Sequence, residues 1–576
     1  MNEGNSVHTE SGPRPADLAP TLHAGLDDAV RRVPDRVVRF HSDGEQLTYA
    51  ELAAASRRSA ARLAADGVGP GGVVALLAGN SAEFLVTVFA ASRLGAAVAP
   101  LPLPMGLRDL AGYAERAARI LVASDATHLV LADRLQRLLG SRLELPCGVR
   151  LVGSGALTAP GQERPDRPVD PASPAVLQFT SGSTSAPKGV VLTHDNVTAC
   201  AASIMEAIAL GPADAHASWL PLFHDMGLFG TLTGIFTGIP VNLWAPAAFV
   251  KDPARWLGEF AATRSTISTM PNFAFDALVD AVPDPTGLDL SAWRVAFNGA
   301  ELIRASSVRT FAAHFAGAGF RPQVMTPGYG MAEATLVATL PPLGRGPVVE
   351  HVDRDVLAAT GVAHPREPDG PGVRTIVGLG HAVPTMAVRI AGEADAPLPD
   401  GRVGEIQLRG PAVTGGYLAP AAQPFTEDGW LATGDLGYLR AGELFFTGRV
   451  KEMITVRGTN CYPTDVEAEA AHVPGVRKGR CVAYADLDAP GGERIAVVAE
   501  TALTDVSRRA ALTSAIARHV SRSLGITALA VHLVEPGAIP RTTSGKLRRL
   551  HAAAVVAGSP SDTTAQPVPR EEVSTP

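Results

Sequence analysis

The sequence predicts an α/β protein with a large N-terminal body of α/β subdomains, a β-rich subdomain and a small C-terminal α/β domain. A chain of 576 residues is longer than one hydrophobic core supports, so two or more domains are expected. Amphipathic helical patterns alternate with short apolar runs, which is typical of parallel sheets covered by helices. With 46% hydrophobic and 19% charged residues, the chain carries enough apolar material for large cores.

The N-terminal half carries this alternation most clearly. Leu52 to Leu63 and Ala82 to Leu94 have the spacing of amphipathic helices, and Val73 to Leu77 between them has the composition of a buried strand. The alternation continues from Val190 to Val337, although a proline-bearing loop is expected at Leu210 to Met226. These patterns predict βαβ units and a parallel sheet.

The C-terminal half predicts smaller elements. Residues 340–376 are rich in glycine and proline and show weak periodicity, so we expect an inserted segment there. The later strand and helix patterns lie at Val383 to Ile390, Gly404 to Arg409, Leu444 to Thr447, Met453 to Val456, Val466 to Ala471, Arg494 to Ala499 and Ser507 to Leu524.

Four segments result from these patterns. We expect a disordered tail over residues 1–19, the body over 20–450, the small C-terminal domain over 451–556 and a second disordered tail over 557–576. The two tails are rich in Ser, Pro, Thr and acidic residues and poor in large apolar side chains, so they cannot offset the entropy of ordering.

Charge and cysteine content exclude several classes of protein. The formal net charge of −7 argues against a chain-wide surface for nucleic acid or anionic membrane. The apolar runs are short and broken by proline, so no integral membrane span is expected. The four cysteines are scattered, which suggests neither a disulfide framework nor a zinc site. Together with a polar N-terminus, these features favour a cytoplasmic protein.

A loop of small hydroxyl residues lies between two strand patterns. It contains Thr180, Ser181, Gly182, Ser183 and Thr184 and ends at Lys188. Small residues let backbone N–H groups approach an anion, the hydroxyls add donors, and the lysine adds positive charge. The glycine follows the lysine, so this is not the loop of a P-loop NTPase. We expect a polyphosphate site, against the alternative of a flexible surface loop.

This loop and four further segments resemble, in order and spacing, the motifs of the adenylate-forming superfamily. That superfamily contains acyl-CoA synthetases, nonribosomal peptide adenylation domains, luciferases and acyl-AMP ligases. The four further segments are Tyr329 to Thr335, Thr433 to Asp435, Gly448 to Glu452 and Pro540 to Lys546. The resemblance extends from about Leu22 to Val556 and implies ATP as the nucleotide and Mg²⁺ as the metal.

The resemblance also implies roles for individual residues. Tyr329 stacks on adenine, a threonine of the same segment faces the phosphate, and Glu333 and Thr180 hold Mg²⁺. Asp435 and Arg449 bind ribose, and Lys546 is the catalytic lysine. Lys451 is the hinge pivot, about which the small C-terminal α/β domain moves as a mobile lid domain. The implied nucleotide site further includes Asn298, Gly299, Ala300, Glu301, Gly328, Gly330, Met331 and Ala332. The implied catalytic residues are Lys546, Glu333, Thr180 and His224.

Three of these roles also agree with elementary chemistry. Asp435 can accept two hydrogen bonds from a ribose diol, although a turn cap is the alternative. Glu333 offers the hard oxygen that Mg²⁺ prefers, although it could be a helix-start carboxylate. Lys546 lies in a Ser/Thr/Gly loop that can enter or leave a site. Taken alone, it would be interpreted as a solvated lysine.

One branch of the superfamily is indicated by further details. Ser218 to Leu228 closely resembles the Trp-Leu-Pro-x-x-His-Asp-Met-Gly-Leu segment of fatty-acyl-AMP ligases. The inserted segment 340–376 lies where those ligases carry an insertion that limits use of free coenzyme A, so an acyl carrier protein is the implied acceptor. The implied acid-binding residues are His224, Asp225, Met226, Gly227, Met270, Asn272 and Phe273. For His224, a pocket role competes with that of a buried core histidine.

One departure from this branch concerns the acid. Ser268-Thr269-Met270 stands where those ligases carry a Gly-Gly pair. Side chains in place of glycines are expected to narrow a tunnel that the backbone otherwise lines. The sequence therefore leaves the identity of the substrate open between a long fatty acid and a short, branched, aromatic or otherwise unusual acid.

The implied function is ATP-dependent activation of a carboxylic acid as acyl-AMP, followed by transfer to the phosphopantetheine thiol of an acyl carrier protein. This activity would belong to polyketide, nonribosomal peptide or lipid biosynthesis. Two alternatives share the first step: a coenzyme A ligase, and an enzyme that activates a small oxyacid such as nitrite for an amine acceptor. A third alternative is a non-catalytic adenylate-binding regulatory protein. The oligomeric state is not predicted.

Overall fold

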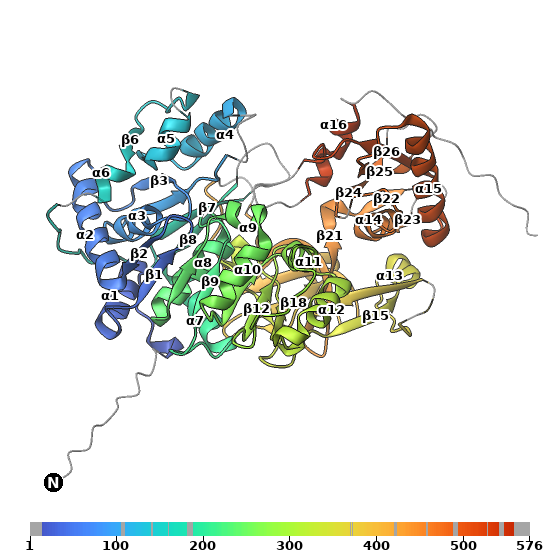
Figure 1. Cartoon of the computed structure of the whole chain (residues 1–576), viewed down its shortest axis with the longest axis horizontal. Coiled ribbons are helices and arrows are strands. Elements are labelled where there is room, and N and C mark those ends of the chain that lie inside the picture. Colours follow the sequence, from blue (N-terminus) through green and yellow to red (C-terminus); the bar gives the residue numbers. More distant parts are fainter. Residues whose placement is uncertain are drawn as a thin grey trace, which may run out of the picture. The chain divides into compact units, whose positions relative to one another are not determined.

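The computed structural model describes residues 14–104, 110–139, 142–158, 161–180, 188–368, 370, 372–419, 423–456, 459–477, 479–487, 493–526, 528–540 and 547–557 (Figure 1). Its contacts divide the chain into two compact units. Unit 1 comprises Met1–Val348, Leu379–Val388 and Leu408–Leu431, and unit 2 comprises Val349–Gly378, Arg389–Gln407 and Ala432–Pro576. Of the expected tails, residues 1–13 and 558–576 lie outside the described residues, and a 3-10 turn, Pro15–Asp17, falls within the first.

The first sheet of unit 1 has seven strands and is parallel except at its β1–β2 edge. Its order is β13 (Met325–Pro327), β12 (Val295–Asn298), β11 (Ile267–Met270), β9 (His216–Ser218), β10 (Val241–Leu243), β1 (Val37–Phe40) and β2 (Glu45–Thr48). The helices that alternate with these strands are α1 (Leu22–Arg32), α7 (His194–Ala207), α8 (Asp225–Thr237), α9 (Pro246–Lys251), α10 (Pro253–Ala262), α11 (Asn272–Ala281) and α12 (Ala305–His314). The expected βαβ alternation is confirmed.

The second sheet of unit 1 has six strands, parallel except for the final hairpin. Its order is β6 (Arg150–Gly153), β5 (His128–Leu131), β3 (Val73–Leu77), β4 (Ala97–Pro100), β7 (Pro174–Thr180) and β8 (Lys188–Thr193). Its helices are α2 (Tyr49–Ala65), α3 (Ala82–Arg93), α4 (Leu110–Ala123), α5 (Asp133–Leu139) and α6 (Ser154–Thr158). A two-stranded antiparallel sheet of β14 (Thr339–Leu340) and β17 (His381–Ala382) also belongs to unit 1. The helices and strand expected between residues 52 and 94 are therefore confirmed.

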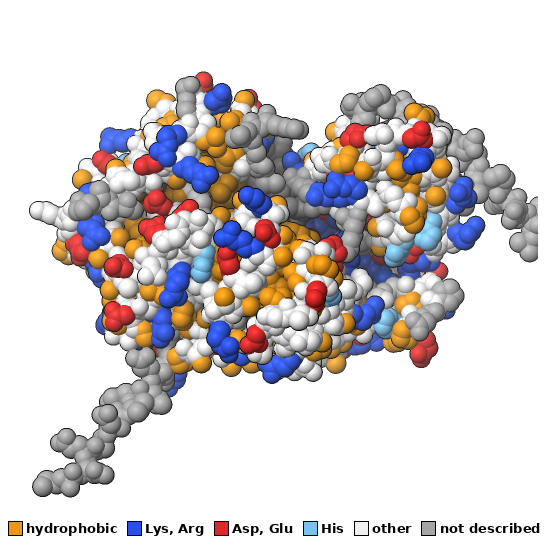
Figure 2. All heavy atoms as spheres, viewed as in Figure 1, with side chains coloured by type: hydrophobic (Ala, Val, Ile, Leu, Met, Phe, Trp, Pro, Cys, Tyr) orange, Lys and Arg blue, Asp and Glu red, His pale blue; other side chains and the backbone are white. Residues whose placement is uncertain are grey.

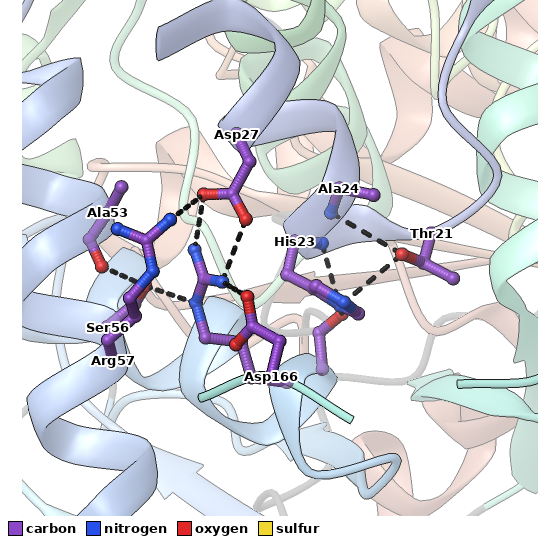
Figure 3. A network of polar contacts seen from close by, with 10 residues as sticks. Thr21, His23, Ala24, Asp27, Ala53, Ser56, Arg57 and Asp166 are labelled. Carbon is purple, nitrogen blue, oxygen red and sulfur yellow. Dashed lines mark hydrogen bonds and ion pairs between the residues drawn. The ribbon is translucent and has the colours of Figure 1, made fainter. Parts of the chain in front are cut away.

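A buried ion network ties the N-terminal helices of unit 1 together (Figure 3). Arg93 on α3 is 1% exposed and donates two hydrogen bonds to Asp27 on α1, at 2.7 and 2.9 Å, and one to Ser56 on α2. Asp166 accepts a further bond from Arg93, and Arg57 also donates to Asp27. Burial alone would raise the pKa of Asp27, but the Arg93 hydrogen bonds and charge outweigh it and lower that pKa.

Unit 2 contains a four-stranded sheet and the inserted segment. The sheet has the order β18 (Ala387–Ala391), β19 (Gly404–Arg409), β20 (Leu431–Arg440) and β21 (Glu443–Arg449). Within residues 340–376 the chain forms β15 (Val349–Asp353), α13 (Arg354–Thr360) and β16 (Val373–Val377), with β15 and β16 antiparallel. The segment is thus more regular than its weak periodicity predicts. The reason is that several side chains of β15 are only half-buried, so this strand forms without a strong apolar repeat in the sequence.

The C-terminal part of unit 2 is a small α/β layer. Its elements are β22 (Ile454–Val456), β23 (Thr459–Cys461), α14 (Pro463–Ala471), β24 (Cys481–Asp486), β25 (Arg494–Glu500), α15 (Val506–Leu524), β26 (Leu529–Val534) and α16 (Ala552–Ala557). A core with Val466, Val497 and Ile516 at 0% exposure lies between its sheet and helices. The helix and strand patterns expected here are confirmed, whereas a lid that begins at residue 451 stays a prediction.

Three general features bear on the classes excluded from sequence. All four cysteines are free. Over the described part of the chain, no helix has both the length and the apolar character needed to cross a bilayer. On the visible face, basic and acidic side chains are interspersed (Figure 2).

Candidate active site

The carboxyl ends of three parallel strands create the edge at which the predicted site residues gather. In the register of the first sheet, Met270 of β11 pairs with Asn298 of β12, and Asn298 pairs with Pro327 of β13. The segments that follow these strands, 271–273, 299–301 and 328–333, therefore emerge side by side. Ligands of open α/β sheets bind at such carboxyl edges.

A network of amides and carboxylates joins these segments. Asn272 donates to Ser307 and accepts hydrogen bonds from Asn298 and from the backbone of Arg304. Glu301 accepts the backbone N–H of Phe273 at 2.6 Å, at the first turn of α11. Glu301, expected in the nucleotide site, therefore also satisfies a helix N-terminus.

The turn that carries Tyr329 requires glycine for packing reasons. A Cβ at Gly330 would lie 1.8 Å from the carbonyl oxygen of Leu336, so no side chain fits there. Tyr329 pairs with Thr339 across this turn and is 8% exposed. The backbone N–H of Gly328 donates to the carbonyl oxygen of Asn298, and that of Gly299 donates to the carbonyl oxygen of Met270. Ala300 adopts φ +66°, a conformation that favours glycine.

Glu333, Tyr417 and Lys188 form the polar centre of unit 1. Glu333 is 7% exposed and accepts a 2.7 Å hydrogen bond from the Tyr417 hydroxyl at Oε1. The Lys188 ammonium lies 5.3 Å from the centroid of the Tyr417 ring. Burial, and then the Glu333 charge, raise the pKa of Tyr417, so it remains a proton donor. One phenol therefore contacts both groups, the carboxylate through its hydroxyl and the ammonium through its ring.

Lys188 and Thr180 mark the base of the expected phosphate loop. They pair directly in the antiparallel β7–β8 register. Ser181, Gly182, Ser183 and Thr184 lie outside the described residues, as does Lys546. The expected roles of these five residues stay predictions.

The threonine of the Tyr329 segment has a buried hydroxyl that bonds to the backbone, and its expected role at the phosphate stays a prediction. Thr335 is fully buried, donates its hydroxyl to the Ala412 carbonyl at 2.7 Å and has φ +62°. Met331 and Ala332 precede Glu333, and Ala332 is 3% exposed. Thr335 therefore supports the backbone around Glu333.

The loop before α8 is held by two buried amides. Asn80 donates to Leu220 and accepts from Leu222, and Gln178 on β7 donates to Phe223 at 2.9 Å. These bonds place the next residue, His224, at the start of α8. A proline-bearing loop is therefore present, as predicted. It is shorter than residues 210–226, because β9 and the first residues of α8 lie within that range.

His224, Asp225, Met226 and Gly227 form the first turn of α8. The Nδ1 atom of His224 lies 3.6 Å from Oδ1 of Asp225, which is too long for a hydrogen bond. That carboxylate accepts the backbone N–H of Met226 at 2.7 Å. Gly227 is required by packing, because a Cβ there would lie 2.1 Å from the Pro221 carbonyl oxygen.

Asp435, Arg449 and Lys451 lie in unit 2. Asp435 on β20 pairs with Arg449 on β21, and their side chains form an ion pair at 3.0 Å. Asp435 is buried whereas half of the Arg449 side chain is exposed. Lys451 is exposed in a 3-10 turn, Val450–Glu452. The ribose and hinge roles of these residues stay predictions.

Sequence reasoning missed Tyr417, Asn80 and Gln178. The available signals were weak: an aromatic residue after Gly415-Gly416, and single amides inside apolar patterns. A buried amide within a strand pattern indicates a backbone partner, but the sequence does not identify that partner.

Comparison with known proteins defines the class. A family model described as AMP-binding enzyme matches residues 26–418, which is more than half of the chain. The chain belongs to this family of adenylate-forming enzymes. A solved structure from a study of fatty acyl-adenylate ligases from E. coli and L. pneumophila superposes with a TM-score of 0.87 and 33% identity, covering 94% of this chain and 98% of that one.

Two curated relatives narrow the comparison further. A candidate acyl-CoA synthetase of Caulobacter vibrioides is 33% identical over 90% of this chain and 92% of its own. The medium-chain-fatty-acid–[acyl-carrier-protein] ligase JamA of Moorena producens is 33% identical over 88% of this chain and 90% of its own. The predicted family, fold class and resemblance to fatty-acyl-AMP ligases are confirmed.

Proposed function

We propose that the protein activates a carboxylic acid with ATP and transfers the acyl group to an acyl carrier protein. The observation that carries the proposal is the cluster of Glu333, Tyr417 and Lys188 at the base of the phosphate loop. A buried carboxylate suits a hard divalent cation, and an ammonium beside a hydroxyl-rich loop suits a polyphosphate. The family match and the similarity to fatty acyl-adenylate ligases support the same activity.

In the first step a carboxylate oxygen of the acid attacks the α-phosphorus of ATP. The new O–P bond forms as the bond from that phosphorus to the bridging oxygen breaks, giving acyl-AMP and pyrophosphate. Positioning and charge neutralisation supply most of the rate enhancement in such reactions. Lys188 and the Thr180 loop would bind phosphate oxygens, Tyr329 would bind adenine, and Lys546 would approach the reacting carboxylate.

Mg²⁺ fits the residues present. Among the described residues, the Tyr417 hydroxyl bonds to Oε1 of Glu333, so Oε2 would be the oxygen offered to a cation. Bound Mg²⁺ would neutralise charge on the phosphates. Tyr417 keeps the Glu333 carboxylate in one orientation.

In the second step a thiol sulfur attacks the acyl carbonyl, and AMP leaves. We propose a phosphopantetheine thiol of a carrier protein as the nucleophile. This is supported by the resemblance to fatty-acyl-AMP ligases and by the relative named as an acyl-carrier-protein ligase. Burial raises the pKa of the Cys200, Cys461 and Cys481 thiols, so none of these three is an activated nucleophile.

The decisive experiment measures acid-dependent pyrophosphate release with a broad panel of acids. Lys546→Ala is expected to abolish pyrophosphate exchange while transfer from preformed acyl-AMP remains nearly intact. Loss of both steps would contradict the proposed division of labour. No release with any acid would support a non-catalytic adenylate-binding protein instead.

A coenzyme A ligase is the second candidate, because one relative is named as a candidate acyl-CoA synthetase. Thioester formation with coenzyme A and with phosphopantetheinylated carrier protein should be compared at equal thiol concentration. Faster transfer to coenzyme A would favour this candidate. A parallel assay for products formed from nitrite and an amine acceptor tests the oxyacid alternative.

A further inference from the structure

Two histidines and one glutamate gather where α14 and α15 pack against each other in unit 2. Glu469 is on α14, His472 directly follows the last residue of that helix, and His519 is on α15. One ring nitrogen of each histidine and one carboxylate oxygen of Glu469 all lie within 4.8 Å of one another. Among the described residues, no other group of three His, Cys, Asp or Glu side chains offers ligand atoms at this spacing.

The separations within this group are close to those that a bound metal requires. Nε2 of His519 lies 2.9 Å from Oε2 of Glu469, and Nδ1 of His472 lies 4.0 Å from the same oxygen. Around a tetrahedral Zn²⁺ with bonds of about 2.0–2.2 Å, neighbouring ligand atoms are about 3.3–3.6 Å apart. Changes of about 0.4–1.5 Å in these separations would therefore produce a metal site.

The core of the C-terminal layer fixes the backbone that carries the three side chains. Each of them directly precedes a buried residue of the core that α14 and α15 share, namely Ala470, Val473 and Val520. Ligands on packed helices are held more precisely than ligands on loops. The side chains of Glu469, His472 and His519 are 25%, 71% and 42% exposed, so an ion can reach them from solvent.

The electrostatics at the end of α14 favour a cation. This helix runs over Pro463–Ala471, and His472 is its C-cap. The C-terminus of a helix carries a partial negative charge of about half an elementary charge, which attracts cations near the last turn. Glu469 lies in that last turn and adds the charge of its carboxylate.

The donor set indicates which metal would bind. Imidazole nitrogens suit Zn²⁺ and neighbouring transition metals, whereas Mg²⁺ and Ca²⁺ prefer oxygen ligands. Zn²⁺ has no geometric preference from its d electrons, so it accepts ligands that two separate helices present. Three protein ligands leave one position of a tetrahedron for water.

We infer that Glu469, His472 and His519 bind one Zn²⁺ and that the ion cross-links α14 to α15. The scattered cysteines predict no zinc site, and this site contains none of them. Its ligands were not apparent in the sequence, because His519 lies 50 residues from Glu469. Zinc binding here needs neither nucleotide nor acid, so the inference does not depend on the proposed function.

The test titrates Zn²⁺ into the full-length, tag-free protein after EDTA has removed any metal. Competition with a chromophoric chelator measures the affinity. We expect one equivalent of Zn²⁺ to bind at this site with micromolar or tighter affinity. Millimolar Mg²⁺ should not displace it, because Mg²⁺ prefers oxygen ligands.

Three ligand variants and one control assign the binding. His472→Gln, His519→Gln and Glu469→Gln should each weaken Zn²⁺ binding about 10-fold or more, since even an outer partner of a metal ligand contributes 10-fold to 100-fold. His364→Gln is the control, because His364 is an exposed histidine of unit 2 outside this group. The melting temperature without metal shows whether each variant is folded.

Hydrogen exchange tests the cross-link separately. A ligand that binds only the folded state stabilises it, so Zn²⁺ should slow exchange in α14 and α15 of the parent protein. The same addition should leave exchange in His519→Gln unchanged. Zinc binding without slower exchange in the two helices would overturn the cross-link.

The remaining outcomes decide the site itself. Absence of Zn²⁺ binding to the folded parent protein would overturn the inference. Equal affinity in the parent and the three ligand variants would place the ion elsewhere and overturn it as well, as would an equal loss in His364→Gln. Each of these results leaves acid activation intact, because pyrophosphate release tests that activity independently.

Discussion

At the scale of single residues, Tyr417 links two groups that the sequence places far apart. Its hydroxyl donates to Glu333 and its ring contacts Lys188. A hydrogen bond to a charged group contributes about 1.5–3 kcal/mol, so the phenol has a measurable share in orienting the carboxylate. The raised pKa of Tyr417 keeps this donor protonated across the usual assay range.

Tyr417→Phe should lower kcat for pyrophosphate release about 10-fold to 100-fold with little change in folding. The ring and its contact with Lys188 remain, whereas the bond to Glu333 is lost. Steady-state kinetics at varied Mg²⁺ would show a raised requirement for the metal. Tyr438→Phe is the matched control, because Tyr438 donates to Glu350 at the same 2.7 Å in unit 2. Equal losses in both variants would contradict a specific role.

At the scale of elements, α8 and the loop before it depend on a close approach of backbone to backbone. The loop 219–224 is held by Asn80 and Gln178, and Gly227 allows the first turn of α8 to contact Pro221. The loop and helix therefore form one rigid element. Such rigidity suits the acid-binding role that we propose for this element, because an acid must be held within attack distance.

Gly227→Ala should destabilise the protein by about 1–3 kcal/mol and lower activity, because the new methyl group would overlap the Pro221 carbonyl. Gly258→Ala on α10 is the control, since nothing lies within 4 Å of its Cβ position. That change should be neutral or stabilise by up to about 1 kcal/mol. Thermal unfolding and pyrophosphate release measure both effects. A Gly227→Ala variant as stable and active as Gly258→Ala would exclude the close approach.

The inserted segment is anchored within unit 2 by Arg374 on β16. Its guanidinium donates to the Thr447 carbonyl, lies 3.2 Å from Asp465 and stacks 4.0 Å from the Tyr462 ring centroid. Arg374 is 8% exposed. Removing one partner of a buried ion pair is costly because the other charge stays buried.

Arg374→Met should destabilise unit 2 by about 3 kcal/mol. Hydrogen exchange is expected to rise in β16 and at the start of α14. Arg366→Met is the control, because the Arg366–Asp353 pair lies at the surface and contributes about 0–1 kcal/mol. Unchanged exchange in Arg374→Met would mean that other contacts hold the segment.

At the scale of the whole molecule, buried histidines couple folding to pH. Burial, and then the charge of Arg93, lower the pKa of His23 to about 4. Burial, and then the charge of His23, lower the pKa of His194 to about 4, and burial lowers that of His216 equally. All three belong to unit 1, where they are neutral at pH 7.

Stability should therefore fall as the pH drops from 6.5 toward 4. In this window the unfolded chain binds protons at these histidines while the folded protein does not, so protonation favours unfolding. Each histidine contributes about 2 kcal/mol of this loss by pH 4.5. Urea unfolding at pH 7.0, 5.5 and 4.5 measures the slope. His194→Asn should reduce it, and the exposed His472→Gln should not; a flat profile for the parent protein would contradict the argument.

Much of the molecule followed from local sequence pattern. The alternation between residues 52 and 94, the later strand runs and the α14 and α15 helices match the structure because burial of a repeating apolar face decides them locally. The secondary structure of the inserted segment was not predicted, because its partly exposed strands lack that repeat. Ordered motifs were enough to identify the family, because phosphate-binding chemistry needs particular residue types at particular spacing.

The sequence by itself determined the class of enzyme and the ordered motifs that carry its chemistry. Only the tertiary structure decided the partners: Tyr417 bonds to Glu333, and Asn80 and Gln178 bond to the loop before α8. The physical reason is that a motif is set by neighbours along the chain, whereas burial and hydrogen-bond satisfaction depend on segments that meet only after folding.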